Sequence, residues 1–336
     1  MVWDVYAAVR ARIVYAGRLG KNVVEDMLAA GNVGDAIGYL RETPYYQYIR
    51  NISIENQELL ELSLYLGLYR SIAPLLAIVD RAYRSIAEHG LLFIENRVIA
   101  SILISLAVGE TPSLDLKILE GTRLGELYRI AIEDRSFIKA LDHLRGKGFA
   151  SLVENYNILS KYMDPGSAIS IASDIGAAKD LSGIAKAEPS LSRLICPEID
   201  FILVQTAIRI SRGRAKEYIG PAELSDIACR IDRGEIEDLY SYREEENILN
   251  VLRKIYGAQL VQRSLEESLI NITSHVRKSI RSSLEAAFSS YPFDPSVVWA
   301  AIRVRVMDVE DIIAIINGKK AGLPIEIIRK IISIAV

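Results

Sequence analysis

The chain has 336 residues, of which 50% are hydrophobic and 7% aromatic, and its formal net charge is -3. The near balance of 40 basic and 43 acidic residues excludes a general attraction to nucleic acid, and the length allows either one large domain or two. The two cysteines, Cys196 and Cys229, are too few and too far apart for a metal cage or a disulfide framework, so the sequence predicts a reduced, cytoplasmic setting.

The sequence predicts a soluble chain that meets a membrane only through a protein partner. Residues 1–12 carry charges and lack the apolar centre of a secretion signal. The longest uninterrupted apolar run covers residues 98–109. It is much shorter than the roughly 20 residues that a spanning helix needs.

The first quarter of the chain predicts helices. Three short ones are expected over residues 2–15, 21–30 and 35–41. A turn at Glu42–Tyr46 follows, and a long apolar-periodic helix is expected from Glu55 to Glu88. Pro74 predicts a kink in this helix, because proline removes a backbone hydrogen bond.

The last quarter predicts three more helices. Residues 244–289 contain no proline, and only Gly257 is a place where a helix could break. Asp294 and Pro295 have the order of a cap and a first helical residue. We expect the helix that they open to stop at Asn317-Gly318, and Pro324 to open a final helix over residues 325–335.

The helix expected after Pro295 has an apolar stripe. Between Val298 and Ile316, apolar residues recur at steps of three and four, so this stripe must be buried. The charges fall outside it. Arg305 and Asp308 are neighbours on one flank, and Arg303 and Glu310 share the other.

The chain contains a weak internal repeat of about 105 residues. The pattern Leu28…Tyr45 returns as Ile132…Phe149 at an offset of 104. Three acids, Glu95, Asp200 and Asp308, each precede an apolar helical run, and they are 105 and 108 residues apart. We expect each acid at the start of a helix, where it pairs with a neighbouring repeat or caps the helix end.

The phase of this repeat predicts the domain organisation. Residues 1–90 have no acid-led helix of their own, and the helix led by Asp308 fills that place if the C-terminal segment returns to the N-terminal one. The prediction is an all-α chain of three related helical domains that close into a ring. Their bounds are 1–90 with 297–336, 91–195, and 196–296.

The sequence predicts no catalytic, cofactor or metal site. The three histidines, His89, His143 and His275, do not stand at metal-ligand spacing. The segment Gly17–Lys21 superficially resembles a phosphate-binding loop, but it lacks the full spacing and a preceding strand. A turn between two helices is the prediction for it. An enzyme with a site built from scattered acids is a further alternative.

Charged residues are the remaining candidates for contacts between domains or with a partner. They are Arg10, Arg12, Glu42, Glu95, Asp200, Arg209, Arg305 and Asp308. The first two arginines belong to a basic stretch with Arg18 and Lys21, and Arg209 to one with Arg212, Arg214 and Lys216. For each basic residue a solvated helix face is the alternative, and for each acid a helix-end cap or a solvated position.

Several short motifs point to one family. They are Tyr6-Ala-Ala-Val-Arg-Ala, Glu42-Thr-Pro-Tyr, Tyr291-Pro-Phe, Ile315-Ile-Asn-Gly-Lys and Gly322-Leu-Pro. In this order the chain resembles the C subunit of archaeal and bacterial A/V-type ATP synthases, the equivalent of the d subunit of eukaryotic vacuolar ATPases. Asp308 takes the family's acidic position, whereas Asp311 replaces an asparagine and Ile313 a basic residue.

The resemblance implies an all-helical funnel of three related domains with pseudo-threefold symmetry and a central cavity. It also implies a non-catalytic rotor subunit without a cofactor, on the cytoplasmic side of the membrane. Such a subunit is a socket that receives the central shaft, made of the D and F subunits, rests on the proteolipid ring and transmits torque. Without the resemblance, the residues favour a soluble helical repeat adaptor that binds another protein.

Overall fold

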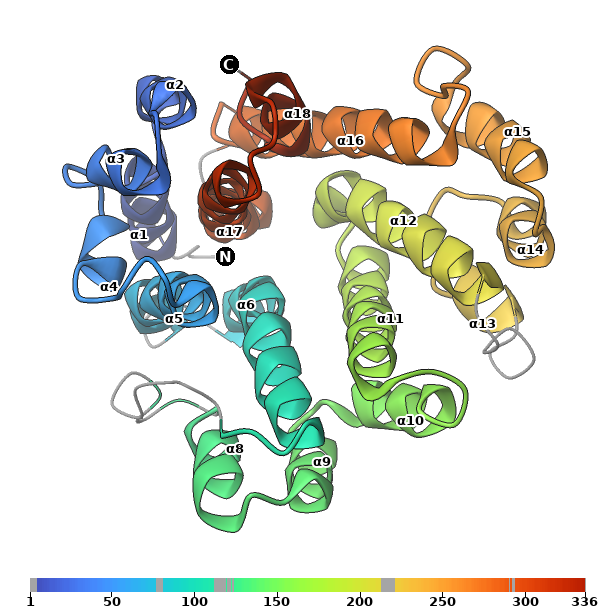
Figure 1. Cartoon of the computed structure of the whole chain (residues 1–336), viewed down its shortest axis with the longest axis horizontal. Coiled ribbons are helices and arrows are strands. Elements are labelled where there is room, and N and C mark those ends of the chain that lie inside the picture. The colour runs from blue at the N-terminus through green and yellow to red at the C-terminus, as the bar shows by residue number, and fades with distance from the viewer. Residues whose placement is uncertain are drawn as a thin grey trace. The chain divides into compact units, whose positions relative to one another are not determined.

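The computed structural model describes residues 5–76, 81–111, 119, 122, 124–212, 221–289, 291 and 294–335. All the regular secondary structure in these residues is helical (Figure 1), so the predicted all-α class is confirmed. The chain divides into two compact units, one of Met1–Ile94 with Thr273–Val336 and the other of Glu95–Ile272. The ring of three related domains stays a prediction.

The first unit combines the two ends of the chain. Its helices are α1 (Val5–Ala16), α2 (Lys21–Ala29), α3 (Val33–Gly38), α4 (Tyr46–Ile49), α5 (Gln57–Leu76), α17 (Pro295–Lys320) and α18 (Ile325–Ile331). Parts of α6 (Arg81–Ala107) and α16 (Leu265–Ala287) also belong to it. Figure 1 shows α1 beside α17, and α17 also packs against α2, α3, α5 and α18.

The second unit consists of helices that pack against their neighbours along the chain. Its elements are α8 (Gly125–Arg129), the π-helix η1 (Ile130–Asp134), α9 (Phe137–Gly146), α10 (Ala150–Leu159), α11 (Pro165–Ala187), α12 (Pro189–Arg212), α13 (Pro221–Ser225), α14 (Arg233–Ser241) and α15 (Glu245–Tyr256). Helix α11 packs against α10 and α12. Gly176 allows the close approach to α10, because a Cβ atom there would lie 3.3 Å from the backbone nitrogen of Leu152.

Helix α17 is the core of the first unit. The predicted apolar stripe from Val298 to Ile316 is largely buried, but so are charged residues on the other sides of the helix. Arg305 is 4% exposed and Asp308 is fully buried. The charges do fall outside the stripe, but the flank that carries Arg305 and Asp308 is buried as well, because helices pack around α17 on several sides and not on one face alone.

Helix α17 begins as predicted and ends later. The Asp294 carboxylate accepts a hydrogen bond from the Ser296 N–H at 2.8 Å, which confirms the cap. The predicted stop at Asn317-Gly318 was wrong, since the helix continues to Lys320 and the left-handed glycine is Gly322, with φ of 68°. Gly318 instead gives room to Ile328 of α18, whose side chain a Cβ atom at position 318 would meet at 2.7 Å.

Other boundaries also differ from the sequence prediction. Residues 244–289 form two helices, and α15 ends at Gly257, whose φ of 90° is left-handed. The predicted helix from Glu55 to Glu88 is described as α5 and α6, with residues 77–80 outside the described part. Pro74 lies inside α5. Residues 2–4, Arg214, Lys216, Pro292 and Phe293 also lie outside the described residues.

The three repeated acids do not start helices. Glu95 lies inside α6, Asp200 inside α12 and Asp308 inside α17, so their predicted placement at helix starts was wrong. The apolar run that follows each acid is the second half of a longer helix. All three are at most 6% exposed, and they therefore need polar partners in the interior.

Within the described residues, two helices are long and apolar enough to cross a membrane. They are Gln57–Leu76, with a mean hydropathy of 1.2, and Tyr83–Ala107, with 1.7. The prediction from uninterrupted apolar runs missed both, because each contains a few polar or charged residues. The structure buries 56% and 67% of these stretches. Core helices of soluble proteins can be equally long and apolar, so the two helices are weak evidence for a span.

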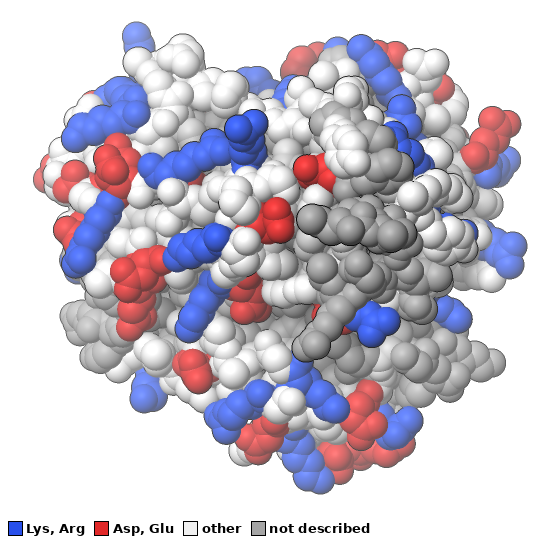
Figure 2. Space-filling model, turned by 180° about the vertical axis from the view of Figure 1, so that it is seen from behind, with Lys and Arg blue, Asp and Glu red and all other residues white. Residues whose placement is uncertain are grey.

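Charges of both signs lie on the face of the molecule that Figure 2 draws. On the face that Figure 2 draws, the coloured basic and acidic side chains are interspersed over much of the area. This distribution agrees with the near-neutral composition. Mixed surfaces of this kind favour oriented contacts with proteins over binding of a polyanion.

The two cysteines form a disulfide bond. Cys196 of α12 is joined to Cys229, in the segment between α13 and α14, with their Cα atoms 5.4 Å apart. The prediction that the two cysteines are too far apart for a disulfide was wrong, because the chain folds back over the 33 residues between them. The bond weakens the argument for a reduced setting, since structural disulfides persist in oxidising compartments and in heat-adapted cells.

Reduction of this disulfide is expected to lower the free energy of unfolding by about 4 kcal/mol, because an open chain regains the entropy that the closed loop had lost. Denaturant unfolding with and without a phosphine reductant measures the difference. The double variant Cys196→Ser, Cys229→Ser is the control and should not respond to the reductant. Equal stability of the wild-type protein under both conditions would contradict the assignment.

Candidate functional site

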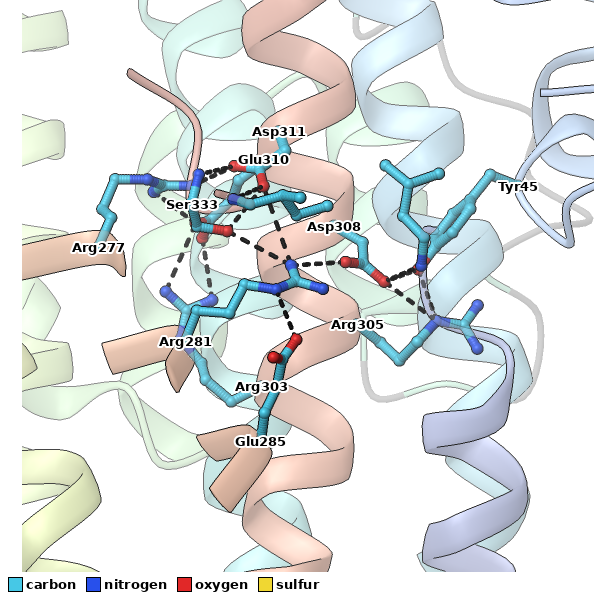
Figure 3. Close-up of polar contacts among 12 residues, drawn as sticks. Tyr45, Arg277, Arg281, Glu285, Arg303, Arg305, Asp308, Glu310, Asp311 and Ser333 are labelled. Atoms are coloured by element: carbon cyan, nitrogen blue, oxygen red, sulfur yellow. Dashed lines mark hydrogen bonds and ion pairs between the residues drawn. The ribbon is translucent and has the colours of Figure 1, made fainter. Parts of the chain in front are cut away.

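Helix α17 carries two carboxylates in the interior of the first unit. Asp308 and Asp311 are one turn apart, and both are fully buried. Figure 3 shows that partners approach them from α16, from the N-terminal segment and from the segment after α18. The desolvation of two ionised carboxylates is costly unless each is paired and hydrogen-bonded.

Asp308 binds the N-terminal part of the chain. Its Oδ2 accepts a hydrogen bond from the Leu19 N–H at 2.8 Å and another from the Tyr45 hydroxyl at 2.5 Å. Its Oδ1 accepts one from Nη1 of Arg281, on α16, at 2.7 Å. One carboxylate therefore connects three segments that are up to 289 residues apart in the sequence.

Asp311 binds the C-terminal segment in a similar way. It accepts hydrogen bonds from the N–H and hydroxyl of Ser333 at 2.8 and 2.7 Å, and from the Ile334 N–H at 3.2 Å. Nη2 of Arg277 completes its surroundings at 2.9 Å. Asp311 thus holds the residues that follow α18 against α17.

Arg305 extends the network to α1. Its Nε donates to the Tyr45 hydroxyl oxygen at 2.6 Å, and its Nη1 donates to the Val14 carbonyl at 2.9 Å. The guanidinium also lies 4.7 Å from the centre of the Tyr45 ring, a cation–π distance. A Cβ atom at Gly17 would collide with Nη1 of Arg305, so a side chain there would force this guanidinium to move.

A second ionic group lies on the other flank of α17. Glu310 pairs with Arg303, which shares this flank, at 3.1 Å, and with Arg277 at 2.8 Å. The Arg303 guanidinium lies 4.3 Å from the centre of the Phe93 ring. Because Arg277 contacts both Glu310 and Asp311, the two ionic groups form one continuous network.

Burial and charge shift the pKa values of this network in different directions. Burial raises the pKa of Asp308, and Arg281 together with the hydrogen bonds from Tyr45 and Leu19 opposes this effect. Burial alone would lower the pKa of Arg281, but the carboxylates of Asp308 and Asp311 raise it above its ordinary value. Burial and the neighbouring charge of Asp308 raise the pKa of Tyr45 well above 10.

The motif Asn317-Gly318-Lys319 makes further contacts between the two ends of the chain. Asn317 donates to the Glu61 carboxylate at 2.8 Å. The Lys319 ammonium group donates to the carbonyls of Leu28 and Ala30, at 2.9 and 2.5 Å, where α2 ends. Cations stabilise such helix C-termini because the last carbonyls have no partner within the helix.

The structure brings Arg305 and Asp308 together, and it places the other predicted residues elsewhere. Arg12 donates to the Phe288 carbonyl at 3.4 Å, within the first unit. Arg10 is partly exposed and Glu42 is exposed. The solvated alternative for Asp308 was wrong, since partners surround its carboxylate.

The remaining predicted residues belong to the second unit. Arg209 pairs with Asp174 at 2.9 Å and also donates to Ser170, so it joins α12 to α11. Glu95 is 1% exposed. Asp200 accepts hydrogen bonds from the N–H groups of Cys229 and Arg230 at 2.8 and 3.1 Å.

Asp200 and Asp308, two of the acids in the predicted repeat, bind other segments in a similar way. Each carboxylate lies inside a long helix and accepts backbone N–H groups of a turn in another segment. Burial of the hydroxyl and the charge of Asp200 raise the pKa of the half-buried Tyr256, whereas Tyr45 is hydrogen-bonded to Asp308. The relation between the three parts of the chain stays a prediction.

Besides Arg303 and Glu310, five side chains of the network were not among the sequence candidates. They are Tyr45, Arg277, Arg281, Asp311 and Ser333. Tyr45 belongs to the Glu42-Thr-Pro-Tyr motif, of which only Glu42 was a candidate. The two arginines are four residues apart on a helix, a spacing that shares one face but does not say what that face contacts.

The chemistry of the network is that of a structural connection. Backbone amides, a phenol and guanidinium groups compensate its carboxylates. Among the described residues, no group of three or more His, Cys, Asp or Glu side chains is placed to hold a metal ion.

The chain was compared with known families and proteins. The family model of the ATP synthase (C/AC39) subunit matches residues 7–331. The chain belongs to this family. A search of curated proteins gave no match.

Family membership defines the setting of the network. The chain is a subunit of an A/V-type ATP synthase, and it is a peripheral part of that membrane-bound complex. The match covers both ends of the chain and therefore includes α1, α16 and α17. In this ATP synthase (C/AC39) subunit, the buried network connects the ends of the chain within one unit.

Replacement of Asp308 by Asn is expected to lower the free energy of unfolding by about 3 kcal/mol, because the buried guanidinium of Arg281 loses its main counter-charge. Glu126→Gln is the matched control. Glu126 pairs with Arg129 at 3.1 Å, but both side chains are 53% exposed, so the loss should stay under about 1 kcal/mol. Denaturant unfolding compares the two variants, and equal losses would contradict a structural role of the network.

Tyr45→Phe is expected to be destabilised by about 1–3 kcal/mol near pH 7, because Asp308 and Arg305 each lose a hydrogen-bond partner. The gap to the wild type should narrow above pH 10. The folded-state pKa of Tyr45 is raised, so its contribution is complete below the unfolded pKa of about 10 and is lost as the pH rises towards the folded value. Unfolding curves of both proteins from pH 8 to 11.5 test this, and a gap that stays constant or widens refutes it.

Proposed function

We propose that this subunit is the non-catalytic socket of the rotor, which links the central shaft, made of the D and F subunits, to the proteolipid ring and transmits torque between them. The observation that carries the proposal is the family match over residues 7–331. It favours a rotary complex over the stand-alone helical adaptor that the residues alone suggest. The subunit works on the cytoplasmic side of the membrane and reaches the membrane through the ring.

The network on α17 fits a part that carries torque. A torque coupler must resist deformation, and close-packed helical interiors transmit strain. In the first unit, Asp308 and Asp311 add directional hydrogen bonds and ion pairs between α16, α17 and both ends of the chain. Such bonds hold the helices in one register, because a shift would leave buried charges without partners.

Helix α1 supplies a surface for a partner. Its small residues Ala7, Ala8 and Ala11 are buried, whereas four larger apolar residues are between 47% and 56% exposed. These are Val5, Tyr6, Val9 and Ile13. They follow one another at helical spacing, so they form a stripe along one face of α1. Contiguous exposed apolar residues of this kind mark interaction sites.

We assign the α1 stripe to the proteolipid ring. We assign charged side chains elsewhere on the surface of the subunit to the shaft. The ring is an apolar partner and suits Val5, Tyr6, Val9 and Ile13. Arg10 borders this stripe and is partly exposed, so it is a candidate for orienting the contact. The assignment of Arg10 and Glu42 to a partner interface remains part of the proposal.

The proposal is tested by a bridging experiment. Membranes that contain the proteolipid ring are mixed with the D–F shaft, with and without the purified subunit, and sedimented. The shaft should sediment with the membranes only when the subunit is present. A shaft that binds the ring equally well without the subunit, or a subunit that binds neither partner, would sink the proposal.

The double variant Val9→Glu, Ile13→Glu distinguishes the proposed contact with the ring from the proposed contact with the shaft. It should lose most of its ring binding, at least tenfold, and retain its binding to the D–F shaft, because charge is introduced only into the α1 stripe. Ile138→Glu is the control, since Ile138 is 72% exposed but lies on α9 of the second unit. Loss of ring binding in the control alone would contradict the assignment of the stripe.

A further inference from the structure

A cavity of about 550 Å³ lies beside the ionic network in the first unit. Three segments far apart in the sequence form its wall. They contribute Arg18, Leu19, Gly20 and Lys21, then Lys278, Arg281, Ser282 and Glu285 of α16, and finally Ser333, Ile334 and Ala335. Its size is within the range of roughly 300–1,000 Å³ that is typical of small-molecule sites.

The wall of the cavity has an excess of positive charge. Arg281 and Glu285 compensate one another at 3.0 Å, and Arg281 is also bound to Asp308. The wall contains three further cations, which are Arg18, Lys21 and Lys278. Their charges face only one acid in the wall, and that acid already has its own partner.

The three cations have weak partners or none among the described residues. Arg18 lies 4.2 Å from the centre of the Tyr15 ring, a contact that leaves its charge without an anion. Lys21 is 3.9 Å from Glu25, and both side chains are about half exposed, so this pair is worth little. Lys278 is half-buried and has neither an ion pair nor a hydrogen bond within the described part of the chain.

Helix α2 begins at this wall, to which Gly20 and Lys21 belong. Its N-cap residue is Gly20, which offers no side-chain acceptor, and the first hydrogen bond of the helix runs from the Val24 N–H to the Gly20 carbonyl. The amides of Lys21, Asn22 and Val23 therefore have no acceptor within α2. Amides in this position bind anions, and the aligned dipoles of the helix favour negative charge there.

From this geometry we propose that the cavity binds the phosphate group of a small soluble molecule. A phosphate carries up to two negative charges and three oxygens that accept hydrogen bonds, which suits three cations from two segments and the amides at the start of α2. The cavity is larger than one phosphate requires, and Leu19, Ile334 and Ala335 give the remaining part of the ligand an apolar surface. The segment Gly17–Lys21 thus contributes to anion binding without forming a phosphate loop.

Occupancy has a structural consequence in the first unit. The ligand contacts the residues before α2, helix α16 and the segment after α18 at once. The same three segments are joined by Asp308 and Asp311. A bound phosphate therefore strengthens the connection between the ends of the chain, and binding raises the stability of the folded state by mass action.

The first experiment measures binding of inorganic phosphate and pyrophosphate to the whole subunit by calorimetry and by the thermal unfolding midpoint, at constant ionic strength set with chloride. Saturable binding and a rising midpoint are expected. Lys278→Gln should weaken the affinity about tenfold or more, the loss of one charge-assisted contact. Lys254→Gln, an exposed lysine on α15, is the matched control and should bind as the wild type does.

Ser282→Asp is a second variant, because Ser282 is an exposed residue of the wall and the change adds repulsion without removing a cation. It should also lose affinity. Vesicles with anionic phospholipid form a separate arm, which distinguishes a lipid headgroup from a soluble phosphate. Binding to vesicles alone would overturn the proposal. So would equal responses to phosphate and chloride, or phosphate binding that Lys278→Gln and Lys254→Gln leave unchanged.

Discussion

Two ionised carboxylates in the interior of a helical unit are the constraint on which the rest of this structure depends. Asp308 and Asp311 are fully buried on α17, and a buried charge without partners is among the most costly features that a fold can contain. The chain meets this requirement with groups from distant segments. Leu19 and Tyr45 approach from the N-terminal part, Arg277 and Arg281 from α16, and Ser333 from the C-terminal end. A structure with the ends of the chain apart would leave Asp308 without the hydrogen bonds from Leu19 and Tyr45.

The same constraint connects the fold with the place of the subunit in an A/V-type ATP synthase. Hydrophobic contacts alone tolerate small shifts of one helix along another, because apolar side chains repack at modest cost. Hydrogen bonds and ion pairs in a dry interior do not tolerate such shifts, since each is favourable only over a narrow range of distances and angles. The network around α17 therefore provides the first unit with one preferred arrangement. Under our proposal, this arrangement lets the subunit pass torque from shaft to ring without acting on a substrate of its own.

Part of the fold and of the network could be predicted from the sequence. The other parts could not, for physical reasons. The all-α class followed from helical periodicity, and the cap at Asp294 followed from local chemistry. Burial of Asp308 did not follow, because a charged residue beside an apolar stripe has the same pattern on a solvated flank as on a flank covered by other helices. Gly318 gave a misleading stop signal, since a glycine that makes room for Ile328 cannot be told by sequence from one that ends a helix. The disulfide was missed for a similar reason, because proximity of Cys196 and Cys229 is a property of the folded chain.

Hydrogen exchange at one backbone amide tests the central claim most directly. The Leu19 N–H lies in the segment between α1 and α2, outside any helix, and its acceptor is the buried carboxylate of Asp308. If Asp308 holds the N-terminal segment against α17, this amide should exchange as slowly as amides in the middle of α17, since both become exposed only when the first unit opens. Exchange of the Leu19 amide as fast as that of the exposed neighbour Gly20 would contradict the account.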